Sequence, residues 1–128
     1  MNNIDSKIKR KLKTSITKRY KLNKGETVEQ WLGCSIIEFK EYIESLMTEC
    51  MSWNNWGVGK EKWQLDHVIP LRLAENRNEH IELNAYQNFQ PLWDDKHKAK
   101  TINGNIIRDC SKIKGGKIGK QKLNDNKR

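Results

Sequence analysis

Long apolar runs and paired cysteines are missing from this chain, and each absence excludes a class of protein. No run reaches the 18 or so apolar residues that a membrane-spanning helix needs. Cys34, Cys50 and Cys110 are widely spaced and form no CxxC pair, which argues against a structural zinc knuckle. The first residues also lack the apolar core of a secretory signal. We therefore expect an intracellular, non-secreted protein with free thiols.

Acidic residues are scarce at both ends of the chain. The formal net charge is +9. Residues 1–25 carry nine Lys or Arg and one acid, residues 26–95 carry five and thirteen, and residues 96–128 carry eleven and two. Basic ends of this kind commonly bind nucleic acid, because each phosphate that they neutralise releases counterions. The alternative is that the lysine-rich ends serve only solubility.

Three parts follow from charge and periodicity. Residues 1–25 form a basic N-terminal helix, residues 26–109 a domain with a helical lead-in, and residues 110–128 a basic, flexible tail. The N-terminal helix has an apolar stripe at intervals of four residues: Ile8, Leu12, Ile16 and Tyr20. A second helix follows Ser35, which matches a capping box with Glu38. We also expect a small core covered by three tryptophans: Trp53, Trp56 and Trp63.

Two short strands and a further helix are predicted in the last third of the domain. Residues 62–71 alternate as a strand that ends near Pro70, and residues 88–93 form a second strand. The connection between the strands is polar and predicts an irregular loop with one helical turn, with His80 at the surface. Residues 94–104 predict a helix capped by an aspartate.

Four residues of types that carry hydrolytic chemistry occur along residues 62–103. Asp66 and His67 are neighbours in the first strand, Asn88 begins the second, and His97 lies in the predicted final helix. The stretches "LDHVIPL", "NFQPLW" and "DDKHKAK" together resemble an HNH endonuclease of the ββα-metal nuclease fold. The preceding "SIIEFKEYIESLMTE" and "MSWNNWG" are similar to the helical lead-in of small phage and large-virus HNH proteins.

The resemblance implies an α+β fold in which a two-stranded hairpin and one helix form the site, with N-terminal helices packed on it. It assigns His67 as the general base, Asp66 and His97 as ligands of one divalent metal, and Asn88 as the residue that ties the loop and orients His67. Asn84 competes with Asn88 for this central position. Magnesium or manganese is favoured and zinc is tolerated. Unlike many relatives, the chain has no CxxC pairs for a structural zinc.

The chemistry of phosphodiester hydrolysis explains why Asp66 and His67 could be neighbours. Hydrolysis of a phosphodiester needs a base for the attacking water, a cation near the leaving oxygen, and an in-line arrangement. Adjacent side chains on a strand point to opposite sides, so Asp66 and His67 could flank one phosphate. Taken singly, each residue has an ordinary alternative: His67 a core histidine, Asp66 a turn cap, Asn88 a turn residue and His97 a solvated helix face.

The sequence therefore predicts a metal-dependent endonuclease that hydrolyses DNA, and the resemblance to HNH enzymes implies products with a 5′-phosphate and a 3′-hydroxyl. The expected partner is double-stranded DNA, and several cationic residues are expected to contact it: Lys9, Arg10, Lys13, Lys96, Lys98 and Lys100. The alternatives are a nucleic-acid-binding protein without turnover on an HNH scaffold, a structural zinc module, and a ribonuclease. Sequence specificity, and the choice between monomer and homodimer, stay open.

Overall fold

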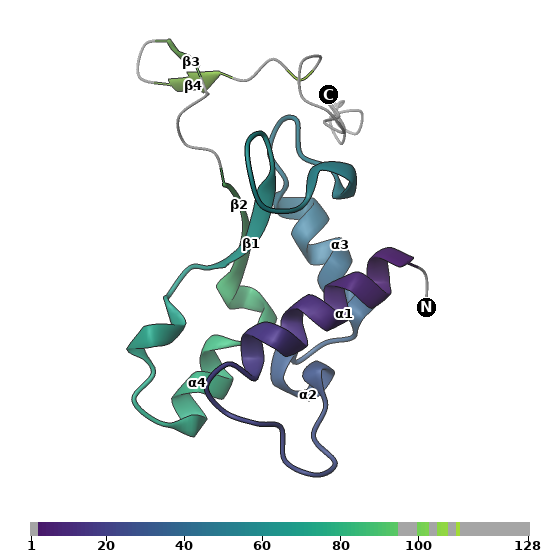
Figure 1. Cartoon of the computed structure of the whole chain (residues 1–128), viewed down its shortest axis with the longest axis vertical. Coiled ribbons are helices and arrows are strands. Elements are labelled where there is room, and N and C mark those ends of the chain that lie inside the picture. Colours follow the sequence, from purple (N-terminus) through teal and green to yellow (C-terminus); the bar gives the residue numbers. More distant parts are fainter. Residues whose placement is uncertain (1–2, 95–99, 103–104, 108–109, 111–128) are drawn as a thin grey trace. The chain divides into compact units, whose positions relative to one another are not determined.

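The computed structural model describes residues 3–94, 100–102, 105–107 and 110 (Figure 1). These residues form four α-helices and two separate two-stranded sheets. The α+β class predicted from the sequence is therefore confirmed. No helix in this part of the chain is both long and apolar enough to cross a membrane.

The chain divides into two compact units. Unit 1 comprises Met1–Ile43 and Asp66–Gln90, and unit 2 comprises Glu44–Leu65 and Pro91–Arg128. Segments far apart in the sequence thus share each unit. The residues of the candidate site that the structure describes belong to unit 1.

α1 (Asn3–Ile16) carries the predicted apolar stripe. Three stripe residues are at most 1% exposed: Ile8, Leu12 and Ile16. Their four-residue spacing aligns them on one buried face of the helix. The helix ends earlier than predicted, and Tyr20 lies beyond it, with its ring centroid 5.0 Å from that of His80. This packing against a distant histidine replaces a further helical turn.

α2 (Val28–Leu32) and α3 (Ile36–Leu46) each begin with a capping box. Before α3, Ser35 Oγ accepts a hydrogen bond from the Glu38 amide at 3.0 Å, and the Glu38 carboxylate accepts one from the Ser35 amide at 2.9 Å. The capping box predicted from the sequence is therefore confirmed. α3 buries three of its apolar residues: Ile36, Phe39 and Ile43.

β1 (Trp63–His67) pairs with β2 (Phe89–Trp93), and both strands were predicted from the sequence. Two backbone hydrogen bonds of 2.8 Å flank the pair: Val68 N to Asn88 O, and Asp94 N to Lys62 O. As the residue number rises along β1, the number of the paired residue in β2 falls, so the strands are antiparallel. In this register Asp66 lies opposite Gln90.

The connection between β1 and β2 contains more helix than predicted. It holds the short 3-10 helices η2 (Leu71–Leu73) and η3 (Tyr86–Asn88), and between them α4 (Arg77–Leu83), whose seven residues make about two turns. Asn76 caps α4 by accepting a hydrogen bond from the backbone amide three residues later. α4 matters for the site because its C-terminal end faces β1 through Asn84.

The prediction that His80 lies at the surface is wrong. His80 is 1% exposed, because its ring packs against Tyr20 and Trp31 at centroid distances of 5.0 and 5.8 Å. Its Nε2 lies 3.0 Å from the backbone oxygen of Ile16, at the end of α1. A polar stretch of sequence gave no sign of these partners, which lie about 50 to 64 residues away in the chain.

The predicted tryptophan cluster is present in unit 2. Trp63 is fully buried, and its ring centroid lies 5.0 Å from that of Trp53 and 6.0 Å from that of Trp56. The indole of Trp63 donates to the Ser52 backbone oxygen at 2.6 Å, and that of Trp53 donates to Glu44 at 2.8 Å. Both indole N–H groups are therefore satisfied, as partly buried tryptophans require.

The helix predicted over residues 94–104 is not the structure found where the chain is described. Lys100–Ile102 forms strand β3, which pairs antiparallel with β4 (Asn105–Ile107). Residues 95–99 and 103–104, which belong to the predicted helix, lie outside the described residues. β-Branched residues and the Asn103-Gly104 dipeptide favour a hairpin in this sequence, and local propensity here outweighs the helix cap signal.

The prediction of free thiols is wrong for two of the three cysteines. Cys50 and Cys110, 60 residues apart in the sequence, form a disulfide within unit 2, and Cys34 is free. Spacing alone does not reveal such a pairing. The expected intracellular location stays a prediction. Of the predicted tail, residues 110–128, the structure describes Cys110, and residues 111–128 lie outside the described residues.

Candidate active site

Asp66 lies near the end of β1 and is held by the neighbouring strand. Its Oδ2 accepts a hydrogen bond of 3.1 Å from Nε2 of Gln90, the residue opposite it on β2. The carboxylate is half-buried, and no other residue of the described part of the chain hydrogen-bonds it. One carboxylate oxygen, Oδ1, is thus left for another partner.

His67 is half-buried and its ring is held on two sides. The ring of Phe89 lies at a centroid distance of 4.3 Å, and Nε2 lies 3.0 Å from Oδ1 of Asn84. Burial lowers the pKa of His67 below its ordinary value of 6.5, while the hydrogen bond to Asn84 and the charge of Asp66 act in the opposite direction. The imidazole is therefore neutral at neutral pH, which is the state that can accept a proton.

Asn84 follows the last turn of α4 and is fully buried. Its Nδ2 donates a hydrogen bond of 2.9 Å to the backbone oxygen of His80, one turn earlier. Both polar ends of the amide are thus engaged, one by the helix and one by the ring of His67. This satisfies a buried polar side chain that would otherwise destabilise unit 1.

Asn88 ties together two segments of the connection. Its Oδ1 accepts from the amide of Ile69 at 2.9 Å, and its Nδ2 donates to the carbonyls of Ile69 at 3.0 Å and Leu83 at 2.8 Å. The side chain therefore links the loop after β1 to the end of α4. The two asparagines that compete in the sequence have separate partners, the loop for Asn88 and the imidazole for Asn84.

The remaining predicted site residues cannot be placed beside this group. His97, Lys96 and Lys98 lie outside the described residues, and Lys100 is described only as the first residue of β3. The structure thus brings together Asp66 and His67 of the sequence-predicted site, with Asn88 holding the adjacent loop. Whether His97 joins them stays a prediction.

Asp66 is the candidate ligand for a divalent metal at this site. In this part of the chain no three His, Cys, Asp or Glu side chains gather closely enough to hold an ion. Asp66 provides the type of oxygen that magnesium and manganese prefer, and its Oδ1 is not taken by Gln90. A cation on Asp66 would need water, substrate oxygens or His97 to complete its ligands.

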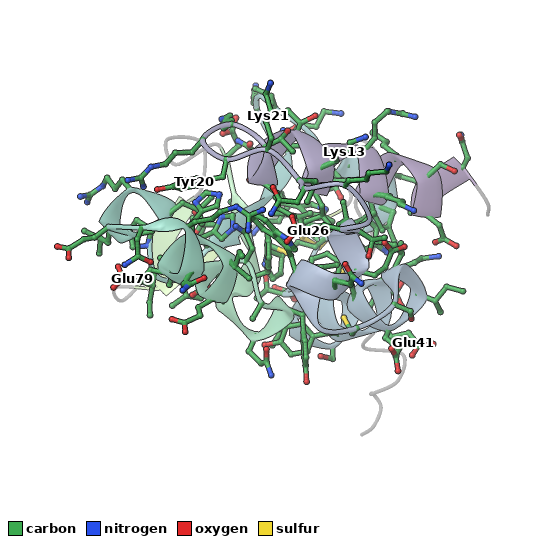
Figure 2. All side chains as sticks on the ribbon, turned by 90° about the horizontal axis from the view of Figure 1, so that it is seen from below. Lys13, Tyr20, Lys21, Glu26, Glu41 and Glu79 are labelled. Atoms are coloured by element: carbon green, nitrogen blue, oxygen red, sulfur yellow. A yellow bond between two sulfur atoms is a disulfide. The ribbon has the colours of Figure 1, made fainter. Side chains whose placement is uncertain are left out.

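The cationic residues predicted to contact nucleic acid on α1 differ in their surroundings. Lys9 is paired with Glu29 at 3.3 Å, whereas Arg10 and Lys13 are exposed. In the view of Figure 2, Lys13 and Lys21 lie toward one side and Glu41 toward the other. Arg10 and Lys13 are therefore better placed than Lys9 to meet an anionic partner.

Comparison with known proteins yields one relative of unassigned function. Over 105 residues, or 80% of the chain, the sequence is 32% identical to an uncharacterized protein of Acanthamoeba polyphaga mimivirus. The chain spans 43% of that protein's length. No family model and no solved structure matches the chain. The candidate site must therefore be judged on its own geometry.

Two residues that hold the site were not assigned a role from the sequence. Gln90 lies in the "NFQPLW" strand, and the antiparallel register that puts it opposite Asp66 could have been derived from the two strand predictions. For Asn84 the sequence indicates only that it competes with Asn88 for the central asparagine position. Its contact with His67 crosses 17 residues of sequence and has no local signal.

Proposed function

We propose that the chain is a metal-dependent endonuclease of the HNH type that hydrolyses DNA phosphodiester bonds. The observation that carries the proposal is the environment of His67. Its half-buried imidazole is kept neutral by burial and stands beside a carboxylate, Asp66, with one oxygen unused by the described residues. A base and an adjacent anionic ligand are two of the requirements of phosphodiester hydrolysis.

In this proposal each side chain has one task. His67 takes a proton from a water molecule, and the resulting hydroxide attacks phosphorus opposite the leaving oxygen. Asn88 keeps the loop after β1 in place beside His67. Asp66, together with His97, would hold one divalent cation, which would supply positive charge to stabilise the phosphoryl and leaving oxygens. Magnesium or manganese is the favoured ion and zinc is tolerated.

The proposed partner is double-stranded DNA. The exposed cations of α1, Arg10 and Lys13, support this part of the proposal, since each phosphate contact adds a salt-dependent increment of affinity. Lys96, Lys98 and Lys100 are proposed to contribute from the later basic segment. By resemblance to HNH enzymes, the products carry a 5′-phosphate and a 3′-hydroxyl.

Plasmid nicking tests the proposal. Supercoiled DNA is incubated with the protein and magnesium, manganese or zinc, and in parallel with EDTA. We expect metal-dependent nicking that His67→Ala reduces by about 100-fold or more, the usual contribution of a general base. Gln87→Ala, an exposed change in the same connection, serves as the matched control and retains activity. Undiminished nicking by His67→Ala would remove the assigned base.

A second candidate is a nucleic-acid-binding protein without turnover. The observation that favours it is the pair of exposed cations on α1, Arg10 and Lys13, which would bind phosphates whether or not the chain cleaves them. DNA retained in a gel-shift assay, without nicking under any of the three metals, would establish this alternative. An RNA substrate in the same panel distinguishes a ribonuclease from a deoxyribonuclease, because net charge does not separate the two.

A further inference from the structure

The orientation of the Asn84 amide is determined by its surroundings. The backbone oxygen of His80 can only accept a hydrogen bond, so the Asn84 atom 2.9 Å from it must be the NH₂ group. The other atom of the amide, 3.0 Å from His67, is therefore the oxygen. Reversing the amide would place two acceptors together at His80, within a fully buried residue, at a cost in stability.

This orientation has a consequence for the imidazole of His67. An amide oxygen can only accept, so Nε2 of His67 must carry the hydrogen that it donates. A neutral imidazole has one N–H, and its other nitrogen, Nδ1, then holds a lone pair. Within the described residues, Nε2 is the one ring nitrogen of His67 with a hydrogen-bond partner.

The support of Asn84 extends to a second helix. His80, whose carbonyl orients the amide, is fully buried between Tyr20 and Trp31, and its Nε2 bonds the backbone oxygen of Ile16 at 3.0 Å. α4 is thereby held against the end of α1. The acceptor offered to His67 thus comes from a side chain fixed at both of its polar atoms.

We propose that Asn84 is a positioning residue that selects the Nε2–H form of His67, so that Nδ1 is the atom that takes the proton from water. The assignment of the tautomer follows from the hydrogen bonds alone, and only the transfer of a proton from water to Nδ1 rests on the proposed nuclease function. In the step, a water O–H bond breaks and an Nδ1–H bond forms. The hydroxide oxygen forms a bond to phosphorus as the bond from phosphorus to the leaving oxygen breaks, and solvent protonates the leaving oxygen. The Nε2–H bond to Asn84 persists throughout and orients the imidazolium.

Nuclear magnetic resonance of the metal-free protein, without substrate, tests the tautomer directly. At pH about 8, well above the usual histidine pKa of about 6.5, ¹⁵N-labelled His67 should show a protonated Nε2 and a bare Nδ1. A slowly exchanging imidazole proton should correlate with Nε2. Comparison with His67→Ala identifies the signals. A proton on Nδ1, or a ring proton that exchanges too fast to detect, would overturn the inference whether or not the protein cleaves DNA.

Two substitutions test the role of Asn84 in the reaction. Asn84→Leu removes the acceptor, and we expect loss of the slowly exchanging Nε2 proton and a fall in kcat of about 10- to 100-fold, as for other residues that orient a reacting imidazole. KM for DNA should stay within about twofold. Asn84→Asp keeps an oxygen acceptor for His67 at nearly the same size and should preserve the Nε2 proton signal, although it loses the donor to the His80 carbonyl and therefore costs stability. If neither variant folds, the ring spectrum of the wild-type protein still decides the tautomer.

Asn76→Ala is the matched control on the same helix. It removes the N-cap of α4 and costs about 1 kcal/mol of stability, but it leaves the amide beside His67 untouched. We expect the Nε2 proton and kcat to be retained. Equal loss of the ring proton in both variants would assign Asn84 a purely structural role. An inactive wild-type protein with the predicted ring signals would reject the nuclease proposal and leave the tautomer assignment standing.

Discussion

Replacement of Asn88 by alanine separates its structural role from its proposed role in catalysis. The side chain makes three hydrogen bonds, to the amide and carbonyl of Ile69 and to the carbonyl of Leu83. The two bonds to Ile69 are exposed and the bond to Leu83 is partly buried. At about 0.5–1.5 kcal/mol for each bond, with the exposed pair at the lower end, Asn88→Ala should lower the free energy of unfolding by about 2–3 kcal/mol.

Urea unfolding followed by far-ultraviolet circular dichroism measures this loss, because most of the helical residues lie in unit 1. For a slope near 2 kcal/mol/M, the midpoint should fall by roughly 1 M. Asn23→Ala is the matched control: Asn23 is exposed, and its hydrogen bonds to Glu26 use the backbone of Asn23 alone. An unchanged midpoint for Asn88→Ala would refute the structural reasoning.

The same variant tests whether the loop held by Asn88 matters for His67. Under the proposed function, nicking by Asn88→Ala should fall at least about tenfold. The assay contains no urea and is run at a temperature at which the variant is still folded. Full nicking activity together with the expected loss of stability would show that the loop is a structural element and does not position the base.

Four further predictions follow from single contacts. In the metal-free protein the pKa of His67, followed by its ring signals in nuclear magnetic resonance, should lie below 6.5 because the side chain is partly buried. Protonation of His67 then favours the unfolded chain. The contribution of His67 to stability is therefore full above pH 6.5 and falls as the pH drops below it. Reduction of the Cys50–Cys110 disulfide, whose cysteines are 60 residues apart, should destabilise unit 2 by up to about 4 kcal/mol, seen as a lower urea midpoint of tryptophan fluorescence; an unchanged midpoint counts against the bond. Ser35→Ala should cost about 1 kcal/mol by removing the cap of α3, measured by thermal unfolding. Arg10→Gln should reduce the slope of log affinity against log salt by about 1 if the side chain meets one phosphate, and an unchanged slope would exclude that contact.

Contacts within one turn or one strand were predictable from the sequence. The stripe of α1, the Ser35 cap and the two paired strands all follow from spacing that repeats every two to four residues. Each of these features needs only the geometry of its own element. The tryptophan cluster was predictable as well, because three large apolar side chains within eleven residues must share the core near them.

The errors concern partners that are distant along the chain or signals that compete locally. His80 reads as a surface residue in a polar stretch, and its burial depends on Tyr20 and Trp31 from another part of unit 1. Cys50 and Cys110 give no hint of pairing in their spacing. At residues 100–107, helix and hairpin signals overlap, and the chain adopts strands where it is described.

By itself, the sequence determined which residue types lie beside one another in β1 and where α3 begins. Asp66 and His67 are adjacent in the sequence and therefore adjacent in the strand. Ser35 precedes Glu38 by three residues, which is the spacing of a capping box. The tertiary structure alone decided which asparagine meets His67, which oxygen of Asp66 is taken, and that His80 is buried. These outcomes depend on hydrogen bonds and packing between segments 17 to 64 residues apart, whose geometry is defined only after the elements have packed.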